Sequence, residues 1–265
     1  MPRFAPQPER RPAIVTGASS GIGAATAVAL AELGHPVVLG ARRLDECQLL
    51  AEKIRANGGA AQALRVDVTD TESIDEFVTG AEAEFGPTEI VVSAAGHLVF
   101  GLVHELTPEQ YLQQVNLHLV GPQRLAHRVL PGMLERERGD FVLISSDTAT
   151  TPRPRSGAYP AAKAGVEAMA RQLWMELEGT GVRASLVRPG PTLTAMGTDT
   201  TAEIIGPVLE DWSTWGFARH SEMLKAANLA SAVVAVVSAP RGAHIQLTEV
   251  QPEARVTPRK NGGAS

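Results

Sequence analysis

The 265-residue chain has one cysteine, few aromatic residues and no long apolar run. Cys47, the single cysteine, cannot form a disulfide within the chain, which fits a reducing compartment. No apolar run reaches about 18 residues, so we expect no membrane span and a cytoplasmic protein. The formal net charge of −5 argues against nucleic-acid binding, which is typical of basic surfaces. The seven histidines show no metal-ligand spacing, and we expect no bound metal.

Short apolar segments alternate with segments of helical pattern along most of the chain. Because the apolar segments are continuous rather than alternating, they indicate parallel strands buried on both faces. The sequence therefore predicts an α/β fold of the Rossmann type, doubly wound, with a mainly seven-stranded parallel sheet and helices on both faces. We expect one domain over 12–252, a flexible N-terminal arm over 1–11 and a flexible tail over 253–265. The predicted strands lie at 12–16, 37–39, 63–66, 90–92, 141–144, 185–187 and 245–250.

The segment Thr107-Pro108-Glu109-Gln110 has the capping-box pattern, with proline at the first helical position, and it predicts the start of a helix. It predicts one long helix from this point toward Leu134.

Three glycines, Gly17, Gly21 and Gly23, lie between the first predicted strand and the first predicted helix. Glycine lets backbone approach a phosphate, and a helix N-terminus offers free N–H groups and partial positive charge. A glycine-rich turn by itself is a weak signal, because turns need glycine in any case. Its place between strand and helix predicts a dinucleotide site.

The end of the second predicted strand bears on the choice of nicotinamide cofactor. An acidic residue there would favour NAD, whereas this chain has Gly40-Ala41-Arg42-Arg43. Arg42, with Arg43 and Ser20, is suited to hold a 2′-phosphate through charge-assisted hydrogen bonds. We therefore expect NADP(H) to be preferred, with NAD(H) possible. The alternative is that the arginines are solvated at a helix start.

A second group of polar residues follows the fifth predicted strand. Tyr159 and Lys163 are four residues apart and share one helix face, and Ser146 lies at the strand's carboxyl end, where α/β sheets place ligands. Ser145 is the competing serine. Asn116 falls within the long predicted helix, where it can instead satisfy backbone groups.

Taken in order, Thr16-Gly17-x3-Gly21-x-Gly23, Ser146, Tyr159-x3-Lys163 and Pro189-Gly190 resemble the short, single-domain branch of the short-chain dehydrogenase/reductase superfamily. The resemblance implies an NAD(P)-dependent oxidoreductase that moves hydride between nicotinamide and a carbonyl or secondary alcohol. Tyr159 would be the general acid or base and Lys163 would lower its pKa. Ser146 would polarise the substrate oxygen, and Asn116 would take part in a proton relay.

We expect the cofactor to be bound by residues of the glycine turn, of the strand ends and of the catalytic helix. They are Gly17, Ser19, Ser20, Gly21, Ile22, Gly23, Arg42, Arg43, Asp67, Val68, Ala94, Ala95, Gly96, Tyr159, Lys163, Pro189, Gly190, Thr192 and Thr194.

In this family the irregular segment over 195–223 generally covers the substrate. The predicted substrate residues come from this segment and from the neighbouring strand ends: His97, Asp147, Arg153, Trp212 and Trp215. The two tryptophans have an equally good structural interpretation, as packing for the segment or for a partner subunit. The family also implies a homo-oligomer, a tetramer or a dimer.

Two departures from the family pattern are Ser93-Ala94-Ala95-Gly96, where asparagines are frequent, and Ala162 before the lysine. Neither removes a catalytic group. The alternative functions are a cofactor-binding regulatory protein of the same fold without turnover, and another dinucleotide-fold enzyme. The Tyr159-x3-Lys163 pair argues against both.

Overall fold

The computed structural model describes residues 6–194, 201–216 and 220–256. A seven-stranded sheet, parallel throughout, forms the centre of the domain, with two-stranded pairing of β7 (Thr192–Leu193) and β8 (Leu224–Lys225) beside it. This confirms the predicted fold class. The strands follow the order β3 (Ala61–Arg65), β2 (Val37–Ala41), β1 (Ala13–Thr16), β4 (Ile90–Ser93), β5 (Gly139–Ile144), β6 (Val182–Pro189) and β9 (Leu247–Val250).

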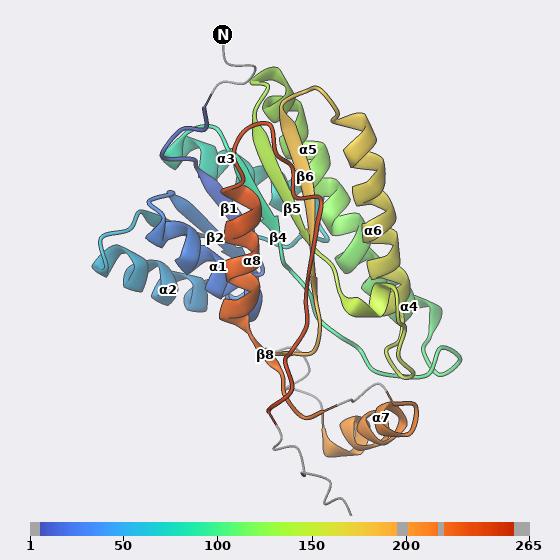
Figure 1. Ribbon diagram of the computed structural model, residues 1–265. Coiled ribbons are helices and arrows are strands. Elements are labelled where there is room, and N and C mark those ends of the chain that lie inside the picture. The colour runs from blue at the N-terminus through green and yellow to red at the C-terminus, as the bar shows by residue number, and fades with distance from the viewer. Residues whose placement is uncertain (1–5, 195–200, 217–219, 257–265) are drawn as a thin grey trace, which may run out of the picture.

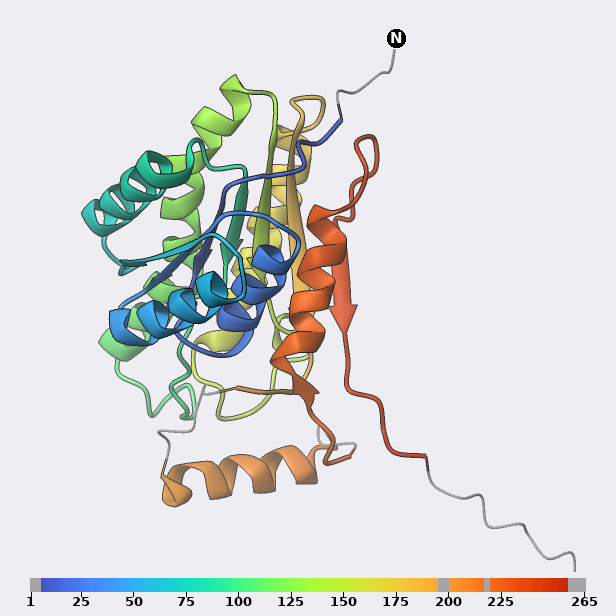
Figure 2. The same ribbon diagram turned by 90° about the vertical axis from the view of Figure 1, so that its left-hand side faces the viewer.

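Helices cover both faces of the sheet (Figures 1 and 2). Consecutive strand residues point to opposite faces, so Val15 and Leu39 enter one hydrophobic cluster and Ile14 and Val38 the other. Both clusters exclude water, which explains why the strands are apolar without interruption. One face is covered by α1 (Gly21–Glu32), α2 (Leu44–Ala56) and α8 (Ala226–Val237), and the other by α3 (Thr71–Phe85), α5 (Gly121–Glu135) and α6 (Tyr159–Glu176).

The long helix predicted from Thr107 is interrupted in the structure. The capping box forms as predicted and starts α4 (Pro108–Val115), but a π-helical turn, η1 (Asn116–Val120), separates it from α5. Pro122 in the first turn of α5 has no N–H to donate to the preceding turn, and its ring crowds the carbonyl there. A single turn with longer-range hydrogen bonding accommodates this proline, and such turns are frequent at functional sites.

The segment after β6 lies apart from the two helical layers. Figures 1 and 2 show α7 (Ala202–Thr214) across the end of the domain toward which the strands run. It comes from the segment predicted to cover the substrate, of which residues 195–200 and 217–219 lie outside the described part. Among the described residues, no helix combines the length and apolar character needed to span a membrane.

The opposite edge of the sheet holds a buried network of charges. Arg11 is 2% exposed and binds Asp140 at 2.5 Å, Glu89 at 3.4 Å and the Val237 carbonyl at 3.1 Å. Arg183 approaches the same Asp140 at 2.7 Å. The prediction of a flexible arm over 1–11 is therefore wrong for Arg11, because its guanidinium neutralises carboxylates at the starts of two strands.

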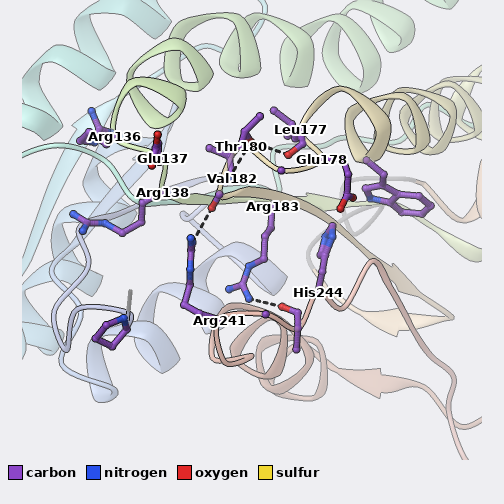
Figure 3. Close-up of a pocket in the computed structure, with 16 residues that line it drawn as sticks. Arg136, Glu137, Arg138, Leu177, Glu178, Thr180, Val182, Arg183, Arg241 and His244 are labelled. Carbon is purple, nitrogen blue, oxygen red and sulfur yellow. Dashed lines mark hydrogen bonds between the residues drawn. The ribbon is translucent and has the colours of Figure 1, made fainter. Parts of the chain in front are cut away.

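A cavity of about 590 Å³ lies beside this network (Figure 3). Arg183 and Arg241 enter it, and they donate to the carbonyls of Ala243 and Gly181, each at 2.8 Å. His244 contacts the Ala184 carbonyl at 2.6 Å. Because α5, α6 and α8 all end at this edge, cations here complement the partial negative charge of helix C-termini. These contacts give the basic residues of the cavity a role in stability.

We predict that Arg11→Ala destabilises the fold strongly. Removing one partner of a buried charge network costs roughly 3–5 kcal/mol, because the remaining carboxylates are left buried and uncompensated. Urea unfolding of the variant and the wild type measures the difference in the free energy of unfolding.

Arg128→Ala is the matched control. Arg128 pairs with Asp75 at 2.7 Å, but the two side chains are 30% and 63% exposed. An exposed pair contributes about 0–1 kcal/mol. Equal losses in the two variants would contradict the structural role assigned to Arg11.

Candidate active site

The site is built where the turn after β1 meets the loop after β4. Gly17 has φ +71°, and a Cβ on it would lie 2.6 Å from the Ala94 carbonyl oxygen. A Cβ on Gly23 would lie 2.4 Å from the carbonyl oxygen of Gly17. These two positions therefore require glycine, because any side chain would push the turn, the loop and the first turn of α1 apart.

A cavity of about 440 Å³ opens above these glycines, a volume within the range of small-molecule and cofactor sites. It brings together many of the predicted cofactor residues, together with His97 from the predicted substrate set. Its lining comprises Gly17, Ser19, Ser20, Gly21, Ile22, Gly23, Ala41, Arg42, Arg43, Ala94, Gly96, His97, Leu117 and Thr194. Ala41 and Leu117 were not predicted, since nothing in their residue type indicates a binding role.

The remaining predicted cofactor residues lie on neighbouring segments and do not line this cavity within the described ranges. Asp67 accepts hydrogen bonds from the backbone and the hydroxyl of Thr69, at 3.0 and 2.7 Å. The carbonyl of Gly190 accepts from the Thr192 hydroxyl at 2.8 Å. The other residues of this group are Val68, Ala95, Tyr159, Lys163 and Pro189.

The two arginines after β2 differ in their contacts. Arg43 donates to the hydroxyls of Ser19 and Ser20, each at 3.0 Å, so it is held at the glycine turn. Arg42 is exposed and lines the same cavity. Two guanidinium groups and two hydroxyls thus surround one end of the cavity, and together they match the charge and hydrogen-bonding needs of a phosphate.

Tyr159 is the first residue of α6, and its side chain meets Ser146. Burial raises the pKa of the Tyr159 phenol to about 12, although the nearby Ser146 side chain acts in the opposite direction. Ser146 also accepts from the backbone and hydroxyl of Thr148, at 3.2 and 2.9 Å. Ser145 is directed elsewhere and donates to Glu167 at 2.9 Å. The serine next to Tyr159 is therefore Ser146.

Lys163 lies one turn after Tyr159, with its Nζ 5.6 Å from the centroid of the tyrosine ring. Nζ donates to the Ile144 carbonyl at 2.7 Å, and burial lowers the pKa of this amine to about 8. Desolvation of the phenol outweighs the opposing contributions from Ser146 and Arg153. The lowering of this pKa by Lys163 stays a prediction. A tyrosine in this environment is protonated at neutral pH.

Asn116 begins the π-helical turn rather than lying inside a continuous helix. Its Oδ1 accepts from Arg124 at 2.8 Å, and the same guanidinium nitrogen lies 3.5 Å from the Val68 carbonyl. The predicted relay asparagine is thus engaged by an arginine from α5, and its role in proton transfer stays a prediction.

His118, on the same turn, is the residue that sequence reasoning missed. It is fully buried, and its ring lies edge-on to Tyr159 with 4.9 Å between ring centroids. No spacing rule marks a lone histidine in a helical segment as part of a site, so only its position in the fold makes it noteworthy.

Three of the five predicted substrate residues come together beside Ser146. Arg153 forms a two-pronged pair with Asp147, at 3.1 and 2.5 Å, and its guanidinium lies 5.3 Å from the centroid of Trp212. Trp212 in turn donates to the Pro154 carbonyl at 2.9 Å. His97 lines the cofactor cavity instead, and Trp215 is 70% exposed beyond the end of α7.

A family model described as short chain dehydrogenase matches residues 11–204. The chain is 36% identical over 247 residues to the glycine betaine reductase ATRR of Emericella nidulans, covering 93% of this chain and 19% of that protein. It is 31% identical over 245 residues to the 2,3-dihydro-2,3-dihydroxybenzoate dehydrogenase of Bacillus subtilis, covering 90% and 93% of the two chains. The chain thus spans about a fifth of the length of the first relative and nearly all of the second.

Two solved structures show the same fold with a nucleotide bound. A variant of the actinorhodin polyketide ketoreductase with NADPH has a TM-score of 0.82 at 28% identity, covering 92% of this chain and 96% of that one. The alcohol dehydrogenase of the archaeon Thermococcus sibiricus with 5-hydroxy-NADP has a TM-score of 0.78 at 27% identity, covering 91% and 96%.

The buried His118 leads to a prediction about stability and pH. Burial and the nearby Lys163 lower the pKa of its imidazole from 6.5 to about 3, so the unfolded chain takes up this proton first as the pH falls. The contribution to stability is therefore complete above pH 6.5 and is lost progressively toward pH 3. The loss amounts to roughly 1.4 kcal/mol per pH unit in that window.

When the pH is lowered from about 7 to about 4, we expect the free energy of unfolding to fall less in His118→Gln than in the wild type. Urea titrations at each pH measure this free energy for both proteins. His35, whose pKa burial also lowers, is present in both proteins and cancels in the comparison. Parallel pH profiles would show that His118 does not titrate as described.

Proposed function

Because the chain belongs to the short-chain dehydrogenase/reductase family, and so is an NAD(P)-dependent dehydrogenase or reductase, we propose that it transfers hydride between NADP(H) and a carbonyl or secondary alcohol. Tyr159 is the proton donor or acceptor in this proposal. The observation that carries it is that Tyr159, at the start of α6, lies near Ser146, with Lys163 one turn further along the helix and its Nζ 5.6 Å from the centroid of the tyrosine ring.

Each catalytic side chain has a distinct task in the proposed reaction. A bound nicotinamide would supply or accept the hydride. Ser146 donates a hydrogen bond to the substrate oxygen and stabilises the charge that develops there. Tyr159 passes a proton to that oxygen or removes one from it. Lys163, held by the Ile144 carbonyl, keeps its amine within reach of the tyrosine ring.

The raised pKa of Tyr159 bears on its role as an acid. Carbonyl reduction leaves an alkoxide that needs a proton, and a phenol with a pKa of about 12 holds its proton at neutral pH. In the proposed reaction the phenol therefore donates its proton when a carbonyl is reduced, and the phenolate takes a proton back when an alcohol is oxidised.

NADP(H) is the proposed cofactor because of the basic end of the nucleotide cavity. Arg42 and Arg43 lie where an acidic residue would accept hydrogen bonds from the ribose of NAD. Two of the structural neighbours are complexes with NADPH or an NADP derivative, which supports the same choice.

The wall formed by Asp147, Arg153 and Trp212 is the proposed substrate contact beside Ser146. The relatives are named for unlike substrates, and the proposed substrate is therefore defined only as a carbonyl or secondary alcohol. Cytoplasmic location and assembly into a homo-oligomer remain predictions.

We predict that Tyr159→Phe loses turnover while it retains cofactor binding. General acid–base catalysis by a positioned side chain is worth about 10²–10⁴ in rate, and the hydroxyl is the only group removed. Nicotinamide absorbance with a panel of carbonyls and alcohols, using NADPH and NADH in parallel, measures turnover, and NADPH fluorescence measures binding.

Tyr111→Phe is the matched control, because Tyr111 is the other tyrosine of the chain and lies on α4. It should leave turnover unchanged. Full activity in Tyr159→Phe would refute the proposed mechanism. A wild type that binds NADPH tightly and turns over none of the panel would favour the regulatory alternative.

A separate prediction concerns cofactor preference. Arg42→Ala and Arg43→Ala should each weaken NADPH binding by about tenfold to hundredfold, the value of one charge-assisted hydrogen bond, and change NADH binding little. Calorimetric titration with both cofactors gives the two affinities. Lys53→Ala is the control, because Lys53 is an exposed cation on α2, the helix that begins directly after the two arginines. Tighter binding of NADH than NADPH by the wild type would overturn the assignment.

A further inference from the structure

His118 lies between the cofactor cavity and the proposed catalytic tyrosine. It belongs to the π-helical turn η1, which packs against α6, and its side chain is 0% exposed. None of the tasks described above uses it. A fully buried histidine with a specific polar contact on one side and Tyr159 on the other calls for an explanation, because an apolar side chain fills such a space at lower cost.

The polar contact fixes the protonation state of the ring. Nε2 lies 2.6 Å from the carbonyl oxygen of His97, and an oxygen of this kind can only accept, so Nε2 carries the hydrogen. Nδ1 is buried without a hydrogen-bond partner among the described residues. Burial and the nearby ammonium of Lys163 lower the pKa of the imidazole to about 3, so the ring is neutral at physiological pH. It therefore acts by shape and by one N–H bond rather than by charge.

The other side of the ring contacts Tyr159. The two rings are nearly perpendicular, at 89°, with their centroids 4.9 Å apart, a favourable geometry for an aromatic pair. The Ser146 side chain lies near the Tyr159 hydroxyl. The imidazole therefore restrains the tyrosine ring itself, through the edge-on contact, at the residue proposed to transfer the proton.

His97 connects this contact to the cofactor. It follows Gly96 in the loop after β4, and both residues line the nucleotide cavity. The hydrogen bond from His118 therefore joins the wall of that cavity to the ring of Tyr159 through a single side chain.

We propose that His118 is a positioning residue for Tyr159: anchored on the carbonyl of His97, its imidazole holds the tyrosine ring in the orientation needed for proton transfer. This inference rests on the proposed function of Tyr159. A displacement of about 1 Å in a reacting group can cost about a hundredfold in rate, so a loosened tyrosine lowers the catalytic rate more than it lowers affinity.

Two substitutions separate the two contacts of His118. His118→Phe keeps a planar ring but removes the N–H, and His118→Gln keeps an N–H that reaches the same carbonyl but removes the ring. Each should lower kcat by about tenfold to hundredfold, with the substrate KM and the NADPH Kd changed far less. His127→Phe, the same change at an exposed histidine on α5, is the matched control and should have wild-type kcat.

Ring dynamics give a readout that does not depend on turnover. In a Tyr111→Phe background Tyr159 is the one tyrosine left, so NMR of ring-labelled tyrosine reports on it alone. We expect faster ring flips in His118→Phe and His118→Gln than in the parent. Wild-type kcat with unchanged ring flips in either folded variant would overturn the proposal.

The two proposals fail in different ways. If the parent protein turns over no carbonyl or alcohol but the ring flips respond to His118, the proposed function fails and the contact stands. If the parent is active and either folded His118 variant matches it in kcat and in ring flips, the positioning role fails and the proposed function stands.

Discussion

The turn after β1 and the loop after β4 approach so closely at Gly17 that no side chain fits between them. β1 pairs with β2 on one side and β4 on the other, so the two segments leave the sheet together at its carboxyl edge. A crevice of this kind, where the order of strands reverses, is where open α/β sheets bind their ligands. Without glycine here the turn would be displaced, and the start of α1, the nucleotide cavity and the loop at His97 would move with it.

The two edges of the sheet meet different physical demands. At the amino edge, Arg11 and Arg183 bind Asp140 away from solvent. The guanidinium groups of Arg183 and Arg241 also donate to backbone carbonyls there (Figure 3). Breaking such a network is costly, so it holds the strand starts in place. The carboxyl edge carries the glycine turn and the partly exposed polar groups that bind ligands. Rigidity at one edge allows open, ligand-accessible structure at the other.

The π-helical turn connects the parts of the site that come from different helices. Asn116 at its start binds Arg124, which also lies near the Val68 carbonyl, while His118 contacts the loop at His97 and the ring of Tyr159. In a continuous α-helix the residues after this point would be rotated to other faces. The position of Pro122 just after the turn gives the local reason for the interruption.

The sequence by itself determined the fold class, the capping box at Thr107 and the candidate pair Tyr159 and Lys163. These follow from local rules: apolar runs for buried strands, hydrogen bonds between near neighbours for a cap, and helical spacing for a shared face. The choice of Ser146 over Ser145 also followed from spacing, and the structure turns Ser145 toward Glu167.

Only the tertiary structure decided the burial of Arg11, the raised pKa of Tyr159 and the place of His118. Each depends on residues distant in the chain: Asp140 neutralises Arg11, and the carbonyl of His97 fixes His118. Desolvation depends on everything packed around a group, and no local pattern records it. Local sequence therefore specified which side chains are present and on which elements they lie. Packing between distant parts of the chain specified how deeply each side chain is buried, which residues it contacts and whether it is protonated.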